Sequence, residues 1–315
     1  MRRELPSSRG LRRRRAPQAA RRAPARHAGF TLVEAMVALG LGLVVVGALV
    51  AAYLAAAQGG RHNDAMVQIT EDATLALSVM RQQVAQAGFG VAHGTAATGP
   101  VLHEFPPVLG CEAANFGDLQ AGILSPAACA GDGGSGAAAP DSLEVAYEAS
   151  VLPGAASNGI LGGAAGDQPL DCLGNAFAPT HDGAKGDYYL NDSKFYVAAG
   201  NLYCHGPGNA AGAAVVQNVE TLQVRYGMAL VGAGQPGAGQ IAYYDVAPPL
   251  GSPLWADVVA VSLCVQVRSA AKVLDTAARA TLGGYIDCDN VQRASGDGYL
   301  RRSFSTTVVL QNRLP

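Results

Sequence analysis

A long apolar run near the N-terminus constrains the fold of this 315-residue chain more than any other feature. The 23 residues from Ala35 to Ala57 carry no charge and are rich in valine, leucine and alanine. At a rise of about 1.5 Å per residue, a helix of this length reaches about 35 Å and can cross a hydrocarbon layer of about 30 Å. We therefore expect a single transmembrane helix. A cleavable secretory signal is the alternative, because small residues precede Gln58.

The charges of the chain divide sharply at this run. Residues 1–29 contain ten arginines and one acid, for a net charge of +9, and the remaining residues carry a net charge of −11. An arginine block can bind nucleic acid, but directly before a membrane helix it more often stays in the cytoplasm and fixes the topology. We expect a single-pass inner-membrane protein with a cytoplasmic N-terminus and a periplasmic C-terminal domain, and no direct nucleic-acid partner.

All six cysteines follow the apolar run, as expected for disulfides formed in an oxidising compartment such as the periplasm. Fifteen pairings are possible. Pairing of sequence neighbours is favoured, with free buried thiols as the alternative. The chain has no CxxC pair, so the spacing argues against a zinc site. The six residues are Cys111, Cys129, Cys172, Cys204, Cys264 and Cys288.

After the apolar run, residues 59–90 keep a helical rhythm that ends at Gly88 and Gly90. One long helix or a helix pair is expected, with a bend at Gly59 and Gly60. Residues 91–180 are rich in glycine, alanine and proline and predict loops around a few short strands, such as residues 142–150. The apolar stripe of residues 59–90 consists of Met66, Ile69, Ala73, Leu77, Met80, Val84 and Ala87.

Strand signals strengthen from residue 185 onward, where β-branched and aromatic runs alternate with turn residues. In residues 258–267 every odd position is apolar, while the even positions include Ser262, Cys264 and Gln266. This alternation predicts a strand with one buried face. The fold expected is therefore α+β, with a long N-terminal helix on a mostly antiparallel sheet domain with long loops.

The stretch GFTLVE at residues 29–34, with an arginine-rich leader before it and an apolar helix after it, resembles the cleavage and methylation site of type IV prepilins. The resemblance implies that a membrane peptidase cuts after Gly29 and methylates the new N-terminal Phe30. Glycine is suitable at the cleavage site, because a backbone without a side chain can lie extended in a narrow cleft of the peptidase. The leader is long for a prepilin, so a translation start further in remains open.

A carboxylate deep in lipid costs about 2.5–3.5 kcal/mol, so we expect Glu34, at the start of the apolar helix, to have a partner. The resemblance implies pairing with the α-amino group of Phe30 on a neighbouring subunit, which sets the register of the fibre. A compatible alternative is a helix cap, because Thr31 and Glu34 match a capping box.

Four-residue spacings of small residues further along the helix would let neighbouring helices approach closely, although small residues are also common in membrane helices. They are Ala38 and Gly42, then Gly47, Ala51 and Ala55.

The C-terminal half resembles the PilW family of type IV pilus assembly proteins, which are large minor pilins. The resembling stretches are residues 71–90, 215–228, 255–269 and 297–315, and with the leader they cover about a third of the chain. The resemblance implies a pilin-like fold and a non-enzymatic subunit of an initiating complex at the pilus tip or cell surface. It also implies prepilin peptidase, other minor pilins, the major pilin, the inner-membrane assembly machinery and membrane lipid as partners.

Two other functions remain open, namely a type II secretion pseudopilin, which shares the leader and helix, and a membrane-tethered adhesin.

No set of catalytic residues stands out and no cofactor is expected, because the histidines are scattered. Acidic turns at Asp182, Asp187 and Asp192, and at Asp287, Asp289 and Asp297, suggest calcium only weakly, since neither follows the EF-hand order. Arg301 and Arg302 either contact an acidic partner pilin or flank the last strand.

Overall fold

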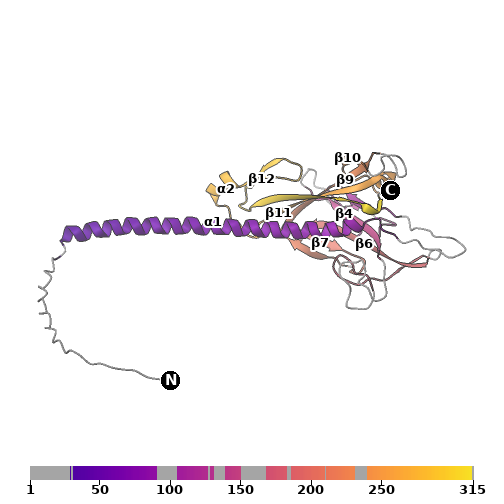
Figure 1. The fold of residues 1–315 in the computed structure, drawn as a ribbon, viewed down its shortest axis with the longest axis horizontal. Helices are drawn as coiled ribbons and strands as arrows, with labels where there is room; N and C mark the ends of the chain where they lie inside the picture. Colours follow the sequence, from indigo (N-terminus) through magenta and orange to yellow (C-terminus); the bar gives the residue numbers. More distant parts are fainter. Residues whose placement is uncertain are drawn as a thin grey trace, which may run out of the picture. The chain divides into compact units, whose positions relative to one another are not determined.

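A computed structural model describes residue 29 and residues 31–90, 105–126, 128–130, 139–149, 168–182, 186–209, 211–230 and 240–313. The chain forms two compact units, residues 1–55 and 56–315, and the helix α1 (Leu32–Gln86) contributes to both (Figure 1). The other elements are β1 (Val108–Cys111), β2 (Asn115–Phe116), β3 (Cys129–Ala130), β4 (Ser142–Ala149), β5 (Thr180–Asp182), β6 (Gly186–Ala198), β7 (Asn201–His205), β8 (Ala213–Gln217), β9 (Val219–Ala229), β10 (Ile241–Asp245), η1 (Pro253–Asp257), β11 (Val258–Arg268), α2 (Thr276–Leu282), β12 (Gly284–Ile286), β13 (Gln292–Ala294), β14 (Arg301–Val309) and η2 (Gln311–Arg313).

The strands of residues 56–315 form two main sheets, where the sequence predicted one. The first has the order β1-β4-β6-β7-β8, with β5 also paired to β6, and the second has the order β10-β9-β11-β14 (Figure 1). Every pairing among the described strands is antiparallel. With the long helix, this arrangement confirms the α+β class.

The chain crosses from the first sheet to the second at Asn218. The run of residues 215–228 looked continuous, but Asn218 has φ of 61° and separates β8 from β9. Asparagine tolerates this left-handed conformation better than most residues. The carbonyl of Asn218 accepts a hydrogen bond from the N–H of Arg268 at 2.9 Å. A single residue therefore turns one apparent strand into two and divides the expected sheet.

The second half of α1 packs on the core of the domain through one face. Its buried residues are Ala65, Ile69, Ala73, Ala76, Met80, Gln83 and Val84. Spacings of three and four place them on one side of the helix. Most of the predicted stripe is therefore buried, and the helix stays continuous through Gly59 and Gly60, where a bend was expected. Burying a side chain such as Ile69 contributes about 1.5–3 kcal/mol.

A network of hydrogen-bonded polar side chains inside the core fixes the position of α1 along the first sheet. The hydroxyl of Tyr147 on β4 donates to Oε1 of Gln83 on α1 at 3.1 Å. The Tyr147 oxygen in turn accepts from Nδ2 of Asn191 on β6 at 2.9 Å, and Ser193 donates to Oδ1 of Asn191 at 2.6 Å. Buried polar groups need such partners, so sliding the helix along the sheet would leave them unpaired.

The predicted alternation in β11 is confirmed. Val261, Leu263 and Val265 are fully buried, whereas Ser262 and Cys264 are half-buried on the other face. The apolar face joins one hydrophobic core that includes the buried face of α1 and residues of both sheets. One hydrophobic core is therefore shared by the helix and the two main sheets.

Candidate functional site

The predicted processing site lies just before α1. Gly29 is exposed and lies outside the helix, whereas Phe30 and the leader are outside the described residues. Thr31 caps the helix: its Oγ1 accepts a hydrogen bond from the N–H of Glu34 at 3.2 Å, and its carbonyl accepts from the N–H of Ala35 at 3.1 Å. The first half of the expected capping box is therefore present.

Glu34 lies in the first turn of α1 and is exposed among apolar side chains. Leu32 and Met36 expose 77% and 65% of their surface. A carboxylate in the first turn is stabilised by the positive end of the helix dipole, but this effect supplies only about 0.3–1 kcal/mol. The pairing of Glu34 with a neighbouring subunit stays a prediction.

All side chains from Thr31 to Ala56 are exposed within this chain. The segment is apolar and long enough to cross a membrane. An apolar surface of this size does not stay in contact with water, so it must be covered from outside the chain. Together with the N-terminal motif, it makes the protein membrane-anchored.

The small residues of α1 occupy two opposite sides of the helix. At about 100° per residue, Ala38 and Gly42 lie on the same side as Glu34, whereas Gly47 and Ala51 lie on the far side. Gly42 and Gly47 have no atom of another residue close to where a Cβ would stand. Each side offers a place where a second helix can approach the backbone, and the pairings themselves stay a prediction.

Three disulfides brace the domain: Cys111–Cys129, Cys172–Cys204 and Cys264–Cys288. They join the sequence neighbours, the pairing that the order of the cysteines favoured. The first ties β3 to β1, the second ties the turn around residue 172 to β7, and the third ties the β12–β13 turn to β11. Each closes a loop of roughly 20–30 residues, for which chain entropy predicts a stabilisation of about 3 kcal/mol.

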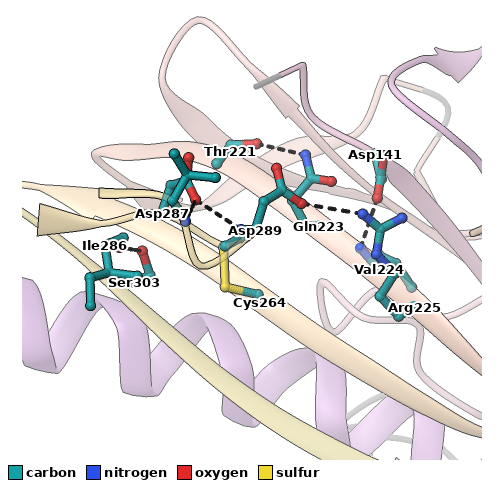
Figure 2. The surroundings of a disulfide bond; sticks show 12 residues. Asp141, Thr221, Gln223, Val224, Arg225, Cys264, Ile286, Asp287, Asp289 and Ser303 are labelled. Atoms are coloured by element: carbon teal, nitrogen blue, oxygen red, sulfur yellow. Dashed lines mark hydrogen bonds and ion pairs between the residues drawn. A yellow bond between two sulfur atoms is a disulfide. The ribbon is translucent and has the colours of Figure 1, made fainter. Parts of the chain in front are cut away.

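Arginines contact the acidic residues near the Cys264–Cys288 disulfide (Figure 2). Arg225 reaches Asp289 at 3.2 Å, and Arg293 reaches Asp287 at 2.7 Å. Burial opposes ionisation of Asp287, but hydrogen bonds from Arg293 and two backbone N–H groups outweigh it and lower its pKa. Among the described residues no three metal-ligating side chains come together. The idea of calcium at this turn therefore gains no support.

Arg301, the first residue of β14, is paired within its own chain. Its guanidinium donates to both oxygens of Glu220, at 2.6 and 2.8 Å, and to both oxygens of Asp297. The hydrogen bonds from Arg301 hold the pKa of Asp297 well below its ordinary value. These bidentate pairs join β9 to β14 across the face of the second sheet.

A buried polar cluster on the first sheet was missed in the sequence. Nζ of Lys194 lies 3.0 Å from Oε1 of Glu144 and 3.3 Å from Oδ1 of Asp192, and the side chains of Lys194 and Glu144 are 3% and 0% exposed. Burial raises the pKa of Glu144, and Asp192 raises it further, while Lys194 opposes the shift. The sequence did contain one signal for this cluster, namely Lys194 within a predicted strand. A lysine is almost never fully buried without a partner.

Two regions of the chain, one N-terminal and one C-terminal, match models of known protein families. Residues 187–312 match the family model of the type IV Pilus-assembly protein W, and residues 24–50 match the prokaryotic N-terminal methylation motif. No curated protein matches the chain. Among solved structures, a type IV-like pilin from Thermus thermophilus aligns over 79% of this chain and 98% of its own, with 10% identity and a TM-score of 0.37. On the two family matches, the chain is a minor pilin of type IV pilus assembly that is similar to the type IV Pilus-assembly protein W.

Proposed function

We propose that prepilin peptidase cleaves this minor pilin after Gly29 and methylates Phe30, and that the mature subunit then joins the complex that initiates the fibre. The proposal assigns residues 1–29 to the leader and 30–58 to a transmembrane helix that becomes part of the fibre core. It assigns 59–90 to an amphipathic helix that continues onto the domain, and 91–315 to the domain itself. The protein acts as a structural subunit and catalyses no reaction.

The observation that carries the proposal is the exposed apolar helix with one carboxylate in its first turn. Lipid covers such a surface before assembly, and the helices of neighbouring pilins replace the lipid afterwards. The α-amino group of Phe30 on a neighbour supplies the cation that Glu34 requires. Because the pair forms only at one axial offset between helices, it selects one register of the fibre.

The orientation in the membrane follows from the charges. The ten arginines before the helix favour a cytoplasmic leader, which leaves the domain on the periplasmic side. The three disulfides support the same orientation, because they persist in an oxidising compartment. The inner-membrane assembly machinery would then extract the subunit from the bilayer and add it to the growing fibre.

The match to the type IV Pilus-assembly protein W favours a pilus over a type II secretion system, although both use the same leader. It covers strands of both main sheets, from β6 to β14. Other minor pilins and the major pilin are therefore the proposed partners. A position at the tip rests on the resemblance to this family, and antibody labelling of intact fibres tests it. Labels along the whole fibre, instead of at one end, would contradict the tip position.

Replacement of Glu34 by glutamine tests the role of the carboxylate. Glu34→Gln keeps the shape of the side chain but removes its charge, so membrane insertion should persist. Loss of a pair that offsets about 2.5 kcal/mol or more lowers the number of fibres per cell by about tenfold or more. Glu71→Gln is the matched control, because Glu71 is an exposed glutamate on the same helix. Equal fibre counts in the two variants would contradict the role of Glu34.

A further inference from the structure

The buried cluster on the first sheet brings an amine and a carboxyl together on neighbouring strands. Glu144 on β4 and Lys194 on β6 stand directly opposite each other in the antiparallel register. Their closest atoms, Nζ and Oε1, are 3.0 Å apart, and Oδ1 of Asp192 lies 3.3 Å from the same Nζ. Lys194 therefore has a carboxyl group of another strand and one of its own strand within reach.

A disulfide-bound segment closes this cluster off from water. The N–H of Ile123 donates to Oδ2 of Asp192 at 2.9 Å, which holds the segment between β2 and β3 over the sheet. Cys129, at the end of that segment, is joined to Cys111. The side chains of Glu144 and Lys194 are 0% and 3% exposed beneath it. The reacting groups lie in a dry, fixed environment.

The charges of the cluster do not balance when all three groups are ionised. Two carboxylates and one ammonium carry a net charge of −1, and burying an uncompensated charge is expensive. Transfer of one proton from Lys194 to Glu144 keeps the net charge at −1 but lowers the number of buried charges from three to one, the carboxylate of Asp192, which accepts from a backbone N–H. It leaves a neutral amine beside a neutral carboxylic acid. A neutral amine and a neutral acid in contact are the reactants of amide formation.

We propose that Lys194 and Glu144 condense into an isopeptide bond that links β4 to β6. The lone pair of Nζ attacks Cδ of Glu144, and a C–N bond forms. Asp192 accepts a proton from the nitrogen and donates one to the departing hydroxyl, so the C–O bond breaks and one water leaves. Atoms and charge balance, and the step needs no oxidant, reductant or activated donor.

Known physical effects support the rate and the direction of this step. Two groups held in contact react with effective concentrations of about 10⁵ to 10⁸ M relative to free reactants. A carboxylate that moves protons within the site adds about 10² to 10⁴-fold. The product is a buried neutral amide in place of a buried amine and acid. The bond would make the two central strands of the first sheet inseparable under a pulling force, independently of the role of the protein in a fibre.

Tryptic digestion and mass spectrometry of the full chain, purified from membranes and reduced, test the proposal directly. Trypsin cannot cleave after a lysine whose amine is an amide. The expected product is therefore a branched peptide in which residues 82–185, with Glu144, are joined to residues 186–225, with uncleaved Lys194, and the intact chain is lighter by one water. The linear peptide 82–225 has the same mass as the branched one, and N-terminal sequencing distinguishes them because only the branched peptide has a second N-terminus at Gly186. Cleavage after Lys194 with unmodified masses for both linear peptides overturns the proposal. So does a water loss confined to the peptide of Lys194 and Asp192.

Variants separate the bond from the folding of the sheet. Lys194→Arg keeps the positive charge but presents a guanidinium that does not deprotonate, so the branched peptide should disappear. Lys272→Arg is the matched control, because Lys272 is an exposed lysine remote from the cluster in sequence, and it should retain the bond. Asp192→Asn should form the bond at least tenfold more slowly. If Lys194→Arg fails to fold, the digest of the unaltered chain still decides the question.

Discussion

Oδ2 of Asp141 accepts a hydrogen bond from the backbone N–H of Val224 at 2.8 Å and thereby joins the start of β4 in the first sheet to β9 in the second. The other oxygen, Oδ1, accepts from the N–H of Ala113 at 2.7 Å, and the N–H of Asp141 donates to the carbonyl of Leu222 at 2.7 Å. One buried side chain therefore satisfies backbone groups in two layers of the domain (Figure 2).

Replacement of Asp141 by alanine should destabilise the domain. Asp141→Ala leaves the N–H groups of Ala113 and Val224 without this acceptor, and a buried donor without a partner costs about 1–3 kcal/mol. Burial raises the pKa of Asp141 to about 6, against the pull of these two N–H groups, so removal of its charge offsets part of the loss. Chemical denaturation of the full chain in detergent measures the effect. Asp64→Ala, at an exposed helix position, is the control, and an equal midpoint in both variants would contradict the bridging role.

Two glycine substitutions should change stability in opposite directions. A Cβ at Gly110 would collide with the hydroxyl of Tyr226 and approach the carbonyl of Ser142, so Gly110→Ala should cost about 1–3 kcal/mol. A Cβ at Gly59 meets nothing, and alanine is the better helix former by up to about 1 kcal/mol. Gly59→Ala should therefore leave the melting temperature unchanged or raise it. A higher melting temperature for Gly110→Ala would refute the packing of β1 on Tyr226.

The C-terminal segment caps the end of α1. Nδ2 of Asn312 donates to the carbonyls of Gln86 and Ala87, at 3.1 and 3.3 Å, where the helix has no further N–H to offer. Loss of these bonds in Asn312→Ala should cost about 0.5–1.5 kcal/mol and increase hydrogen exchange in the last turn of the helix. Gln311→Ala, the exposed neighbour, serves as the control. Unchanged exchange in the last turn of Asn312→Ala would argue against the cap.

The pair between Asp297 and Arg301 should make stability fall in acid. Because Arg301 lowers the pKa of Asp297 in the folded state, the pair stabilises the fold fully above the ordinary pKa of 3.8, and this stabilisation declines below 3.8 until the pH reaches the much lower pKa of the folded state. The side chain of Asp297 is 44% exposed, so solvent screening limits the contribution to about 1 kcal/mol or less. The unaltered chain should exceed Asp297→Asn in unfolding free energy at pH 7, and this difference should shrink progressively between about pH 4 and pH 2. A difference as large at pH 2 as at pH 7 would contradict this linkage.

Local patterns predicted the parts of the fold that depend on neighbouring residues. The spacing of Ile69 and Met80 on α1, and the alternation along β11, report which face is buried, because burial follows the period of each element. The order of the cysteines also favoured the pairs that form. These features need no knowledge of distant contacts.

The remaining features depend on contacts that a local pattern does not contain. The sequence around Arg301 does not show its partner, because Glu220 is 81 residues away and on another strand. Lys194 and Glu144 meet only because β4 pairs with β6 in one register. Asn218 divides the sheet through a single backbone conformation that the strand pattern around it concealed.

The most direct test of the central claim is the mass and N-terminal sequence of the mature protein from cells with and without prepilin peptidase. The mature chain should begin at N-methylated Phe30 only when the peptidase is present. Gly29→Ala should retain its leader, whereas Gly59→Ala should be processed normally. A mature N-terminus near Gln58, or a leader that stays attached in both strains, would contradict the assignment of this protein to the processed pilins.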